Sequence, residues 1–430
     1  MERVMCCDLK AYIGNAVTIK GWAHRVRSMG GIRFVLVRDR TGVAQVIASG
    51  TLAKEPALDA EAVVEVTGAV SPAPQVTSGV EIQAESIRVL SAPVAPLPFE
   101  VNLPDVQAGP ESILNHRPIA LRNPKVRAPF AVQSAICGAF REFLTGEGFT
   151  EVHTPKIVAT GTEGGADLFA VRYFERTAYL AQSPQLYKQM LVGAGFERVF
   201  EIGPAFRAER HNTSRHTNEF TSLDLEMAFI DGLEDLLVLE ECLLEFIFRR
   251  LRESCAEELR LYGVTLPDAT GIPRLRMPQI GEILAREYGK PLTGGALDPE
   301  GERLICEYSD RKTGSPFVFA THFPVSARPV YALPDPGDPC LTLSFDLLFG
   351  GVEMNSGGMR ISDYGQLVAN MARFGLNPAD FESYLEVFRH GMPPHGGFAI
   401  GLERLTAKVL GLENIREATL FPRVRDRLTP

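Results

Sequence analysis

Hydrophobic and polar positions alternate along the first ninety residues in short runs rich in β-branched side chains, which predicts strands. The runs cover residues 16–27, 32–39, 43–49, 62–71 and 80–89. A short helical segment is predicted after the third run, at Leu52–Leu58. Five strands with a helical segment in this place are typical of an OB-fold barrel, which binds single-stranded nucleic acid on one face.

A change in composition marks the end of this barrel. Residues 91–110 contain five prolines and show no helical period. Such a segment forms a semi-rigid spacer. We therefore expect a barrel domain over residues 1–92, a linker over 93–117 and a second domain over 118–430.

The second domain begins with a helical period over residues 125–147, followed by a predicted strand at 149–153. Further helices are predicted at 186–194, 233–258, 277–288, 299–309, 364–373, 378–388 and 402–410. Further strands are predicted at 178–181, 199–208, 219–230, 317–322, 341–348, 352–355 and 397–400. Hairpins packed with helices indicate an α+β domain on an antiparallel sheet flanked by helices.

Composition narrows the class of protein. The 430 residues contain no apolar run of the roughly 18 residues that a membrane span needs, and the start MERVMCCDLK has no apolar core of a signal peptide. We therefore expect a cytoplasmic protein that does not insert into a membrane. Seven cysteines without a C-x-x-C pair predict neither a disulfide framework nor a zinc site.

The net charge of −9 means that binding of nucleic acid would need a local basic patch. Residues 9–38 form such a patch, because they include six Lys or Arg residues and no Asp or Glu. Arg25, Arg27 and Phe34 lie on the first two predicted strands, where an OB-fold has its binding face. A solvated sheet face is the alternative interpretation.

Residues 200–230 predict a long hairpin with one polar face. Strand geometry puts Arg207 and Glu209 on one face, and Phe220, Asp224 and Glu226 on one face of the returning strand. The opposite face of that strand is predicted to enter the core with Leu223, Leu225, Met227 and Phe229. Arginine binds phosphate through two hydrogen bonds and a phenyl ring stacks on a base. A salt-bridged surface hairpin is the alternative.

A second hairpin, over residues 341–355, carries two carboxylates. A turn at residues 349–350 would place Asp346 directly opposite Glu353. Like charges in that position destabilise a strand pair unless a cation lies between them. Carboxylates together with substrate phosphates are typical ligands of Mg²⁺, so we predict a magnesium site. Two solvated carboxylates are the alternative.

The order of these segments resembles the class IIb aminoacyl-tRNA synthetases. FRAE, a loop ending in RHTNEF, and DLEM resemble the second motif of that class; residues 125–155 resemble the first, and GGFAIGLERL the third. QSPQLYKQ at 182–189 and the ending NIREATLFPRVRDRLTP are similar to aspartyl-tRNA synthetases of the compact archaeal type. Val424 departs from the family, which usually has Asp after F-P-R.

The resemblance implies ATP-dependent activation of aspartate and its transfer to tRNA(Asp), with ATP as a substrate and Mg²⁺ as a cofactor. Catalytic roles fall on Arg207, Glu209 and Arg404. ATP binding is implied for Arg207, Glu209, Arg215, His216, Thr217, Phe220, Glu353, Gly401, Leu402, Glu403 and Arg404. Metal ligation is implied for Asp346, Glu353 and Ser356. Aspartate binding is implied for Glu163, Gln185, Lys188, Arg207, Ser356 and Arg360.

The resemblance also implies a homodimer through residues 125–155 and a closing loop at TGTEGG, which contains Glu163. A plain surface loop is the alternative there. Members that charge both tRNA(Asp) and tRNA(Asn) have a histidine where this chain has His24 and a proline in the loop at 71–77. His24 with Pro72 or Pro74 fits that pattern, so the anticodon site is expected to include His24, Arg25, Arg27, Phe34 and Pro74.

Such an enzyme would supply Asp-tRNA(Asn) to a tRNA-dependent amidotransferase. The remaining alternatives are an aspartyl enzyme that discriminates between the two tRNAs, an asparaginyl-tRNA synthetase, a non-catalytic paralogue and a tRNA-independent amide-forming relative. Lys188, QSPQ and Arg360 favour aspartate as the substrate over asparagine. Retention of Arg207, Glu353 and Arg404 argues against a non-catalytic paralogue, and the N-terminal barrel against the amide-forming relative.

Overall fold

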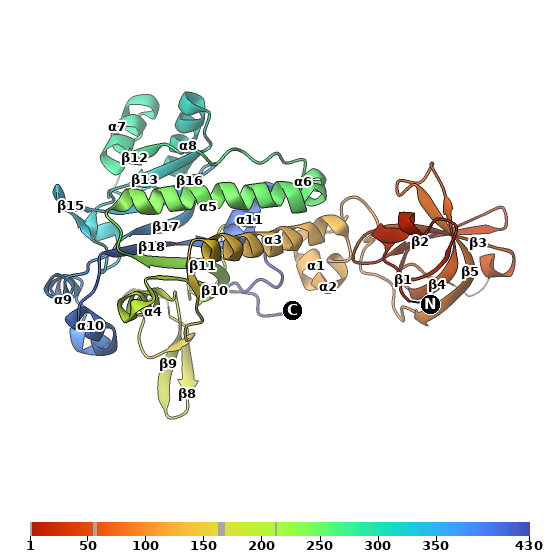
Figure 1. Cartoon of the computed structure of the whole chain (residues 1–430), viewed down its shortest axis with the longest axis horizontal. Coiled ribbons are helices and arrows are strands. Elements are labelled where there is room, and N and C mark those ends of the chain that lie inside the picture. Colours follow the sequence, from red (N-terminus) through yellow and green to blue (C-terminus); the bar gives the residue numbers. More distant parts are fainter. Residues whose placement is uncertain (1, 55–57, 162–167, 211–212, 293) are drawn as a thin grey trace. The chain divides into compact units, whose positions relative to one another are not determined.

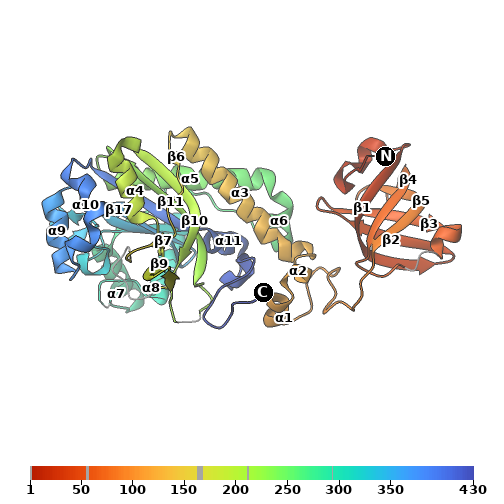
Figure 2. The same cartoon turned by 90° about the horizontal axis from the view of Figure 1, so that it is seen from below.

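A computed structural model describes residues 2–54, 58–161, 168–210, 213–292 and 294–430 of the chain. The chain folds into two compact units, Met1–Asn123 and Pro124–Pro430, shown in Figures 1 and 2. The prediction made for Glu163 falls outside the described residues. In the described ranges, no helix has the length and apolar character required to cross a membrane.

The first unit contains a closed barrel with the strand order β1-β2-β3-β5-β4, which confirms the predicted OB-fold. Its strands are β1 (Ala16–Met29), β2 (Ile32–Arg38), β3 (Val43–Ser49), β4 (Val63–Pro72) and β5 (Val80–Ser91). A 3₁₀ helix, η1 (Cys6–Tyr12), precedes the barrel, and another, η2 (Gly50–Ala53), follows β3 where a longer helical segment was predicted. Two short helices, α1 (Pro110–Asn115) and α2 (Arg117–Ala120), end the unit.

A β-bulge in β1 decides which residues of the barrel point outward. Ala23 pairs with Val37 and Arg25 pairs with Leu36, so His24 is an extra residue without a partner in β2. Before the bulge the odd-numbered residues of β1 enter the core, whereas after it Arg25 and Arg27 are exposed. The bulge therefore keeps the two arginines on the outer face, because one extra residue reverses the alternation of a strand.

The second unit is built on one large sheet. Its described strands have the order β12-β13-β16-β17-β18-β11-β10-β6, antiparallel except for the two edge pairs β12–β13 and β10–β6. The strands are β6 (Thr150–Glu151), β10 (Arg198–Phe206), β11 (Glu219–Ala228), β12 (Arg274–Arg276), β13 (Phe317–Thr321), β16 (Ser344–Phe349), β17 (Val352–Met359) and β18 (His395–Gly401). This confirms an α+β fold on an antiparallel sheet.

Two smaller sheets accompany the large one. One contains β7 (Ile157–Val158), β8 (Ala170–Tyr173) and β9 (Arg176–Leu180); the other pairs β14 (Pro334–Asp335) with β15 (Asp338–Thr342). The helices are α3 (Pro124–Gly146), α4 (Gln185–Leu191), α5 (Leu233–Ser254), α6 (Ala256–Tyr262), α7 (Met277–Tyr288), α8 (Pro299–Thr313), α9 (Tyr364–Arg373), α10 (Glu382–Arg389) and α11 (Leu402–Leu410). The short helices are η3 (Val192–Phe196), η4 (Val325–Ala327), η5 (Pro378–Phe381) and η6 (Ile415–Ala418).

Helices α3, α5 and α11 pack against one face of the large sheet, and Figure 1 shows α3 and α5 side by side along it. Val132, Ile136, Phe140 and Leu144 of α3 recur every four residues, so they form one apolar stripe, and all four are completely buried. Alternate residues of β11 reach the same core. The other face of β11 is therefore left for polar side chains.

The predicted core face of β11 is correct except at its end. Leu223, Leu225 and Met227 are buried in the core, but Phe229 is 69% exposed. The strand ends at Ala228, and Phe229 has a left-handed φ of 55°, which breaks the alternation. Its side chain consequently turns away from the core.

Candidate functional site

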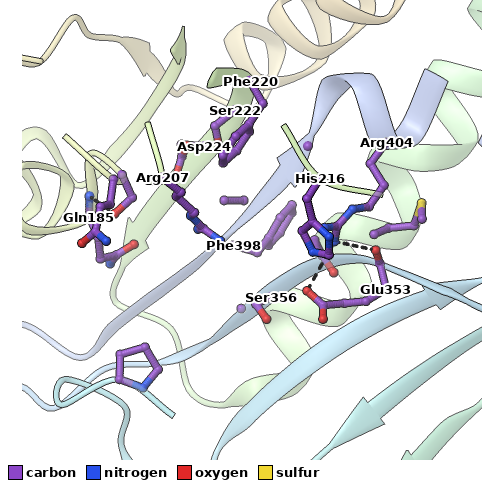
Figure 3. A pocket seen from close by; sticks show the side chains of 18 of the residues that line it. Gln185, Arg207, His216, Phe220, Ser222, Asp224, Glu353, Ser356, Phe398 and Arg404 are labelled. Atoms are coloured by element: carbon purple, nitrogen blue, oxygen red, sulfur yellow. Dashed lines mark hydrogen bonds and ion pairs between the residues drawn. The ribbon is translucent and has the colours of Figure 1, made fainter. Parts of the chain in front are cut away.

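A pocket opens on the polar face of the large sheet, lined by residues of β11, β17 and β18 and of the segments around them. Figure 3 shows that Ser222 and Asp224 of β11, Ser356 of β17 and Arg404 of α11 all lie around this pocket. These residues are far apart in the sequence. The strand order brings them together, because β11 lies beside β18 and β18 beside β17.

Two cations and two carboxylates are paired at the floor of the pocket, which Asp224 and Arg360 line. Lys188 Nζ lies 2.9 Å from Asp224 Oδ1 and 3.5 Å from Glu226 Oε2. Arg360 Nε donates to Glu226 Oε1 at 2.9 Å. Burial opposes ionisation of Glu226, but Arg360 and Lys188 outweigh it and hold the pKa of this carboxyl below its usual range. The cluster is thus held together by three buried ion pairs.

Gly397 of β18 makes room for this cluster. A Cβ atom at this position would lie 2.2 Å from the Leu225 carbonyl oxygen and 2.4 Å from Glu226 Oε2. The Gly397 carbonyl also accepts a hydrogen bond from Arg360 Nη2 at 2.9 Å. Only glycine fits between the Arg360–Glu226 pair and the backbone of β11.

The predicted register of the β16–β17 hairpin is wrong. Asp346 pairs with Ser356 and not with Glu353, which pairs with Leu348. The partner of Asp346 is therefore shifted along β17 relative to the prediction. Two residues of this shift come from the turn, which consists of Gly350 and Gly351, both with positive φ, as a tight hairpin requires. A further residue arises from a bulge in β17 next to Leu347.

Side chains hold that bulge in place. Asn355 Oδ1 accepts a hydrogen bond from the Leu347 backbone N–H at 2.8 Å, and Asn355 Nδ2 donates to Glu240 Oε1 at 2.7 Å. Glu240, on α5, is completely buried. Its burial raises the pKa of the carboxyl to about 8, despite the bond from Asn355.

Asp346 and Ser356 are bonded to each other and to Arg328. Ser356 Oγ donates to Asp346 Oδ1 at 2.5 Å, and Arg328 Nη2 lies 2.7 Å from Asp346 Oδ2. Burial and the charge of Asp346 raise the pKa of Glu353 to about 7, while Arg404 opposes that rise. Arg404 Nη1 lies 3.7 Å from Glu353 Oε1 and donates to its carbonyl at 2.9 Å.

Two further arginines, Arg207 and Arg215, line the pocket. The guanidinium carbon of Arg207 lies 5.3 Å from the centroid of the Phe220 ring, a cation–π arrangement. Arg215 Nη1 lies 3.3 Å from Glu302 Oε2. Glu403 accepts hydrogen bonds from the Thr221 N–H, yet burial raises the pKa of its carboxyl to about 7.

The outer face of the barrel in the first unit carries a second polar surface. Arg27 pairs with Phe34, and Arg25 pairs with Leu36, across β1 and β2. On the neighbouring strands, Glu81 accepts hydrogen bonds from the side-chain amides of Gln45 at 2.9 Å and Gln83 at 3.0 Å. Cations, an aromatic ring and amides on a sheet face are the groups that bind exposed bases and phosphates.

Known protein families match both the unit that contains the pocket and the barrel that carries the second polar surface. Residues 109–425 match the family tRNA synthetases class II (D, K and N), and residues 17–90 match the OB-fold nucleic acid binding domain. The chain belongs to the class II tRNA synthetases. A Deinococcus radiodurans protein named aspartate–tRNA(Asp/Asn) ligase is 47% identical over 100% of this chain and 99% of its own.

Two further relatives show how far the likeness extends. A Thermus thermophilus protein of the same name is also 47% identical, over all of both chains. The solved asparaginyl-tRNA synthetase of Pyrococcus horikoshii with asparaginyl-adenylate superimposes with a TM-score of 0.93 over all of both chains, at 33% identity. The synthetase described here is thus an aminoacyl-tRNA ligase built of an OB-fold unit and a class II catalytic unit.

The fold brings most predicted site residues of the synthetase to one pocket. Those that line it are Gln185, Arg207, Glu209, Arg215, His216, Thr217, Phe220, Glu353, Ser356, Arg360, Gly401, Glu403 and Arg404. Lys188 does not line the pocket, since it is completely buried against Asp224. Leu402 packs in the hydrophobic core, because α11 turns it toward α3 and β11.

Sequence analysis missed Arg328, which lines the pocket and binds both Asp346 and Ser356. Its segment has no helical or strand period, so nothing in the local sequence assigned it to the site. Gln45 and Glu81 were missed as well. The alternation of β3 could have revealed Gln45, because the core positions Ala44 and Val46 on either side of it point inward.

Asp346, Glu353 and Ser356 could bind a divalent cation only if a substrate phosphate and water supplied its remaining ligands. In the described part of the chain, no three His, Cys, Asp or Glu side chains are arranged to hold a metal ion by themselves. Asp346 and Glu353 nevertheless offer carboxylate oxygens, and Ser356 offers a hydroxyl. This donor set suits Mg²⁺ that keeps water and phosphate oxygens as its other ligands.

Glu240 predicts a dependence of stability on pH. The folded protein retains the Glu240 proton up to about pH 8, whereas the unfolded chain releases it near 4.5. Stability should therefore fall as pH rises between these values, by up to about 1.4 kcal/mol per pH unit from this group. Glu240→Gln should remove that contribution, because the amide keeps an acceptor for Asn355 and carries no charge.

The measurement is denaturant unfolding of both proteins from pH 5 to pH 8, followed by circular dichroism. Glu253→Gln, at an exposed position of the same helix, is the matched control and should leave the profile unchanged. Parallel profiles for the wild type and Glu240→Gln would show that Glu240 is ionised in the folded protein.

Proposed function

We propose that the synthetase activates L-aspartate with ATP and transfers it to both tRNA(Asp) and tRNA(Asn). The observation that carries this proposal is the match, along the whole chain, to enzymes named aspartate–tRNA(Asp/Asn) ligase. The pocket supports the choice of amino acid, and the barrel supports the choice of tRNA.

Arg360 is the cation best placed to bind the side-chain carboxylate of aspartate. It lines the pocket, and its Nε and Nη2 are fixed by Glu226 and Gly397. Its Nη1 has no hydrogen-bond partner among the described residues. An ionised substrate group forms a stronger bond with such a donor than the neutral amide of asparagine. Lys188 supports this role by pairing with the carboxylates below.

Activation joins the α-carboxylate of aspartate to the α-phosphate of ATP and releases pyrophosphate. Arg207 has no ion pair with a described residue, which leaves its guanidinium available to hold the two negatively charged reactants together. Phe220 offers a stacking surface for adenine, with Arg404 as the second cation for the nucleotide. Asp346, Glu353 and Ser356 would hold Mg²⁺, which neutralises phosphate charge when bound.

Arg360→Leu should reduce aspartate-dependent ATP–pyrophosphate exchange by at least a hundredfold, since a buried charge that loses its partner costs about 3–5 kcal/mol. ATP binding should persist, because the nucleotide residues lie elsewhere in the pocket. Arg360→Lys is the matched control for charge and should retain more exchange.

Circular dichroism must show that Arg360→Leu remains folded, because Glu226 loses its partner in this variant. Near-normal exchange with aspartate would refute the assignment of Arg360. Exchange with asparagine and not with aspartate in the wild-type enzyme would instead establish an asparaginyl-tRNA synthetase.

The barrel supports the acceptance of two tRNAs. Aspartate and asparagine anticodons differ only in their third base, C in one and U in the other. Arg25, Arg27 and Phe34 lie on the outer face of the barrel beside the bulge at His24, and Pro74 is exposed in the turn between β4 and β5. This surface offers cations and a stacking ring, which bind either pyrimidine.

Transcripts of tRNA(Asp) and tRNA(Asn) should be aspartylated with kcat/KM values within about tenfold of each other, or about 1.4 kcal/mol. The comparison uses the purified enzyme with saturating ATP and aspartate. A preference for tRNA(Asp) above about a hundredfold, or about 2.7 kcal/mol, would show a discriminating enzyme. With both tRNAs charged, the cell would need an amidotransferase to convert Asp-tRNA(Asn).

We also propose a homodimer formed through α3. The helix buries one stripe in its own core, and its other side carries the small exposed residues Ser134 and Gly138, four positions apart. A Cβ atom at Gly138 would meet nothing within 4 Å, so glycine there is not required by packing within the chain. Small residues allow a second helix to approach closely, and C2 pairing is the commonest arrangement of oligomers.

Gly138→Arg should convert the dimer to a monomer in sedimentation, since the long charged side chain would separate the two helices. The fold should survive, because Arg favours a helix more than Gly by roughly 0.8 kcal/mol. Glu282→Arg, at an exposed position of α7, is the control and should remain dimeric. A wild-type enzyme that sediments as a monomer at micromolar concentration would contradict the proposal.

A further inference from the structure

Arg328 binds two of the three residues to which a metal ion is assigned above. Its Nη2 lies 2.7 Å from Asp346 Oδ2, and its Nη1 donates a hydrogen bond to Ser356 Oγ at 3.0 Å. Ser356 Oγ in turn donates to Asp346 Oδ1 at 2.5 Å. These bonds engage both oxygens of the Asp346 carboxylate and the oxygen of Ser356. A cation that binds the same atoms would have to replace the guanidinium or lie beside it.

The pair of Arg328 and Asp346 is well shielded from water. The side chain of Arg328 is 10% exposed and that of Asp346 is 11% exposed. The guanidinium carbon lies 3.6 Å from the centroid of the Phe323 ring, so an apolar surface also adjoins the charge. Water screens the attraction between two charges only weakly in such a place. Arg328 is therefore an effective counter-ion of Asp346.

One donor of Arg328 is left without an acceptor in this position. Its Nε is buried, and no described residue accepts a hydrogen bond from it. A guanidinium has five N–H groups, and a buried N–H without an acceptor is unfavourable. Arg328 also lines the pocket, where an anionic ligand would offer further acceptors. The arginine can thus exchange its place beside Asp346 for a more complete set of hydrogen bonds.

The neighbouring carboxylates are paired in the same way. Arg404 Nη1 lies 3.7 Å from Glu353 Oε1, and Arg215 Nη1 lies 3.3 Å from Glu302 Oε2. Glu302 Oε2 also accepts a hydrogen bond from the Glu353 N–H at 3.3 Å, so these two pairs adjoin each other. Arginines therefore balance the negative charges around the assigned metal position.

We infer that Arg328 is the counter-ion of Asp346 until ATP binds, and that it then moves to a phosphate group and leaves Asp346 to the metal ion. This inference rests on the proposed function, which assigns Mg²⁺ to Asp346, Glu353 and Ser356. A free divalent cation beside Asp346 would be repelled by the guanidinium. The phosphates of ATP attract both the cation and the guanidinium, because their charge is negative. The metal ion therefore binds with the nucleotide and not before it.

The exchange keeps Asp346 paired at every stage. Arg328 neutralises the carboxylate first, and the metal ion does so afterwards. A buried carboxylate without a counter-ion is costly, and this sequence avoids it. A neutral residue in place of Arg328 would leave Asp346 unpaired, so the carboxylate would bind a free divalent cation more strongly than in the wild type.

The test is a titration of the enzyme with Mn²⁺ in the absence of ATP, with free Mn²⁺ measured by electron paramagnetic resonance. Mn²⁺ prefers the same oxygen ligands as Mg²⁺. Arg328→Met removes the charge and keeps an apolar side chain against Phe323. It should lower the Kd for Mn²⁺ about tenfold, or about 1.4 kcal/mol. In ATP–pyrophosphate exchange it should raise the KM for ATP about tenfold and leave the KM for aspartate unchanged.

Two further variants connect the gain in affinity to this ion pair. Arg328→Met/Asp346→Asn should lose the gain, because the carboxylate that would bind the cation is then absent. Arg328→Lys keeps the positive charge, so its Kd for Mn²⁺ should stay within about threefold of the wild-type value. The matched control is Arg276→Met, which breaks an ion pair of 2.8 Å with Asp335 and should leave the Kd for Mn²⁺ unchanged. Arg276 and Asp335 are not among the residues that line the pocket.

Circular dichroism shows whether each variant is folded. Arg328→Gln keeps a hydrogen-bond donor for Asp346 without the charge, and it decides the matter if Arg328→Met does not fold. Binding of Mn²⁺ to the folded neutral variants that is no tighter than in the wild type would overturn the inference. An unchanged KM for ATP in these variants would overturn the movement of Arg328 to a phosphate.

Failure of the proposed amino-acid specificity would have a different result. Wild-type enzyme would then show no ATP–pyrophosphate exchange with aspartate. The Mn²⁺ titration contains neither amino acid nor tRNA, so its outcome still decides whether Arg328 and a divalent cation compete for Asp346.

Discussion

Charge neutralisation inside the catalytic unit is the constraint on which the rest of the pocket depends. Lys188, Asp224, Glu226 and Arg360 are all buried, and an ion without a partner in such a place costs several kcal/mol. The four groups come from α4, β11 and the residue that follows β17, so their pairing ties these segments together. It also requires Gly397, since a larger residue would displace Glu226. In the proposed function, the same pairing leaves Arg360 with one donor for the side-chain carboxylate of aspartate.

Two bulges perform comparable tasks in the two units. In the barrel, the extra residue His24 in β1 leaves the basic side chains that follow it on the outer face. In the catalytic sheet, the bulge in β17 brings Ser356 opposite Asp346, where Arg328 binds both. Each bulge is held by a buried polar contact, to Arg38 in one case and from Asn355 to Glu240 in the other. An extra residue redirects side chains without interrupting a sheet.

Local patterns predicted most of the secondary structure, because burial on one face imposes a period on a sequence. Residues 277–288 and 402–410 form α7 and α11 as predicted, and Gly289 and Gly411 end these helices in the left-handed conformation. The five barrel strands and the two long hairpins were predicted for the same reason. Patterns failed where no period exists, as in the segment of Arg328, and where a glycine turn and a bulge shifted the register of β17.

The sequence by itself determined the two-part organisation, the faces of the strands and the residue types of the pocket, because these depend on hydrophobic period and on motifs within single segments. Only the tertiary structure decided which charges meet. Lys188 is paired below the pocket while Arg360 lines it, and His24, Arg38 and Glu61 meet in one buried network. These contacts join residues that are far apart in the chain. A buried charge is stable only beside a partner, and the tertiary structure decides which partner lies within hydrogen-bond distance.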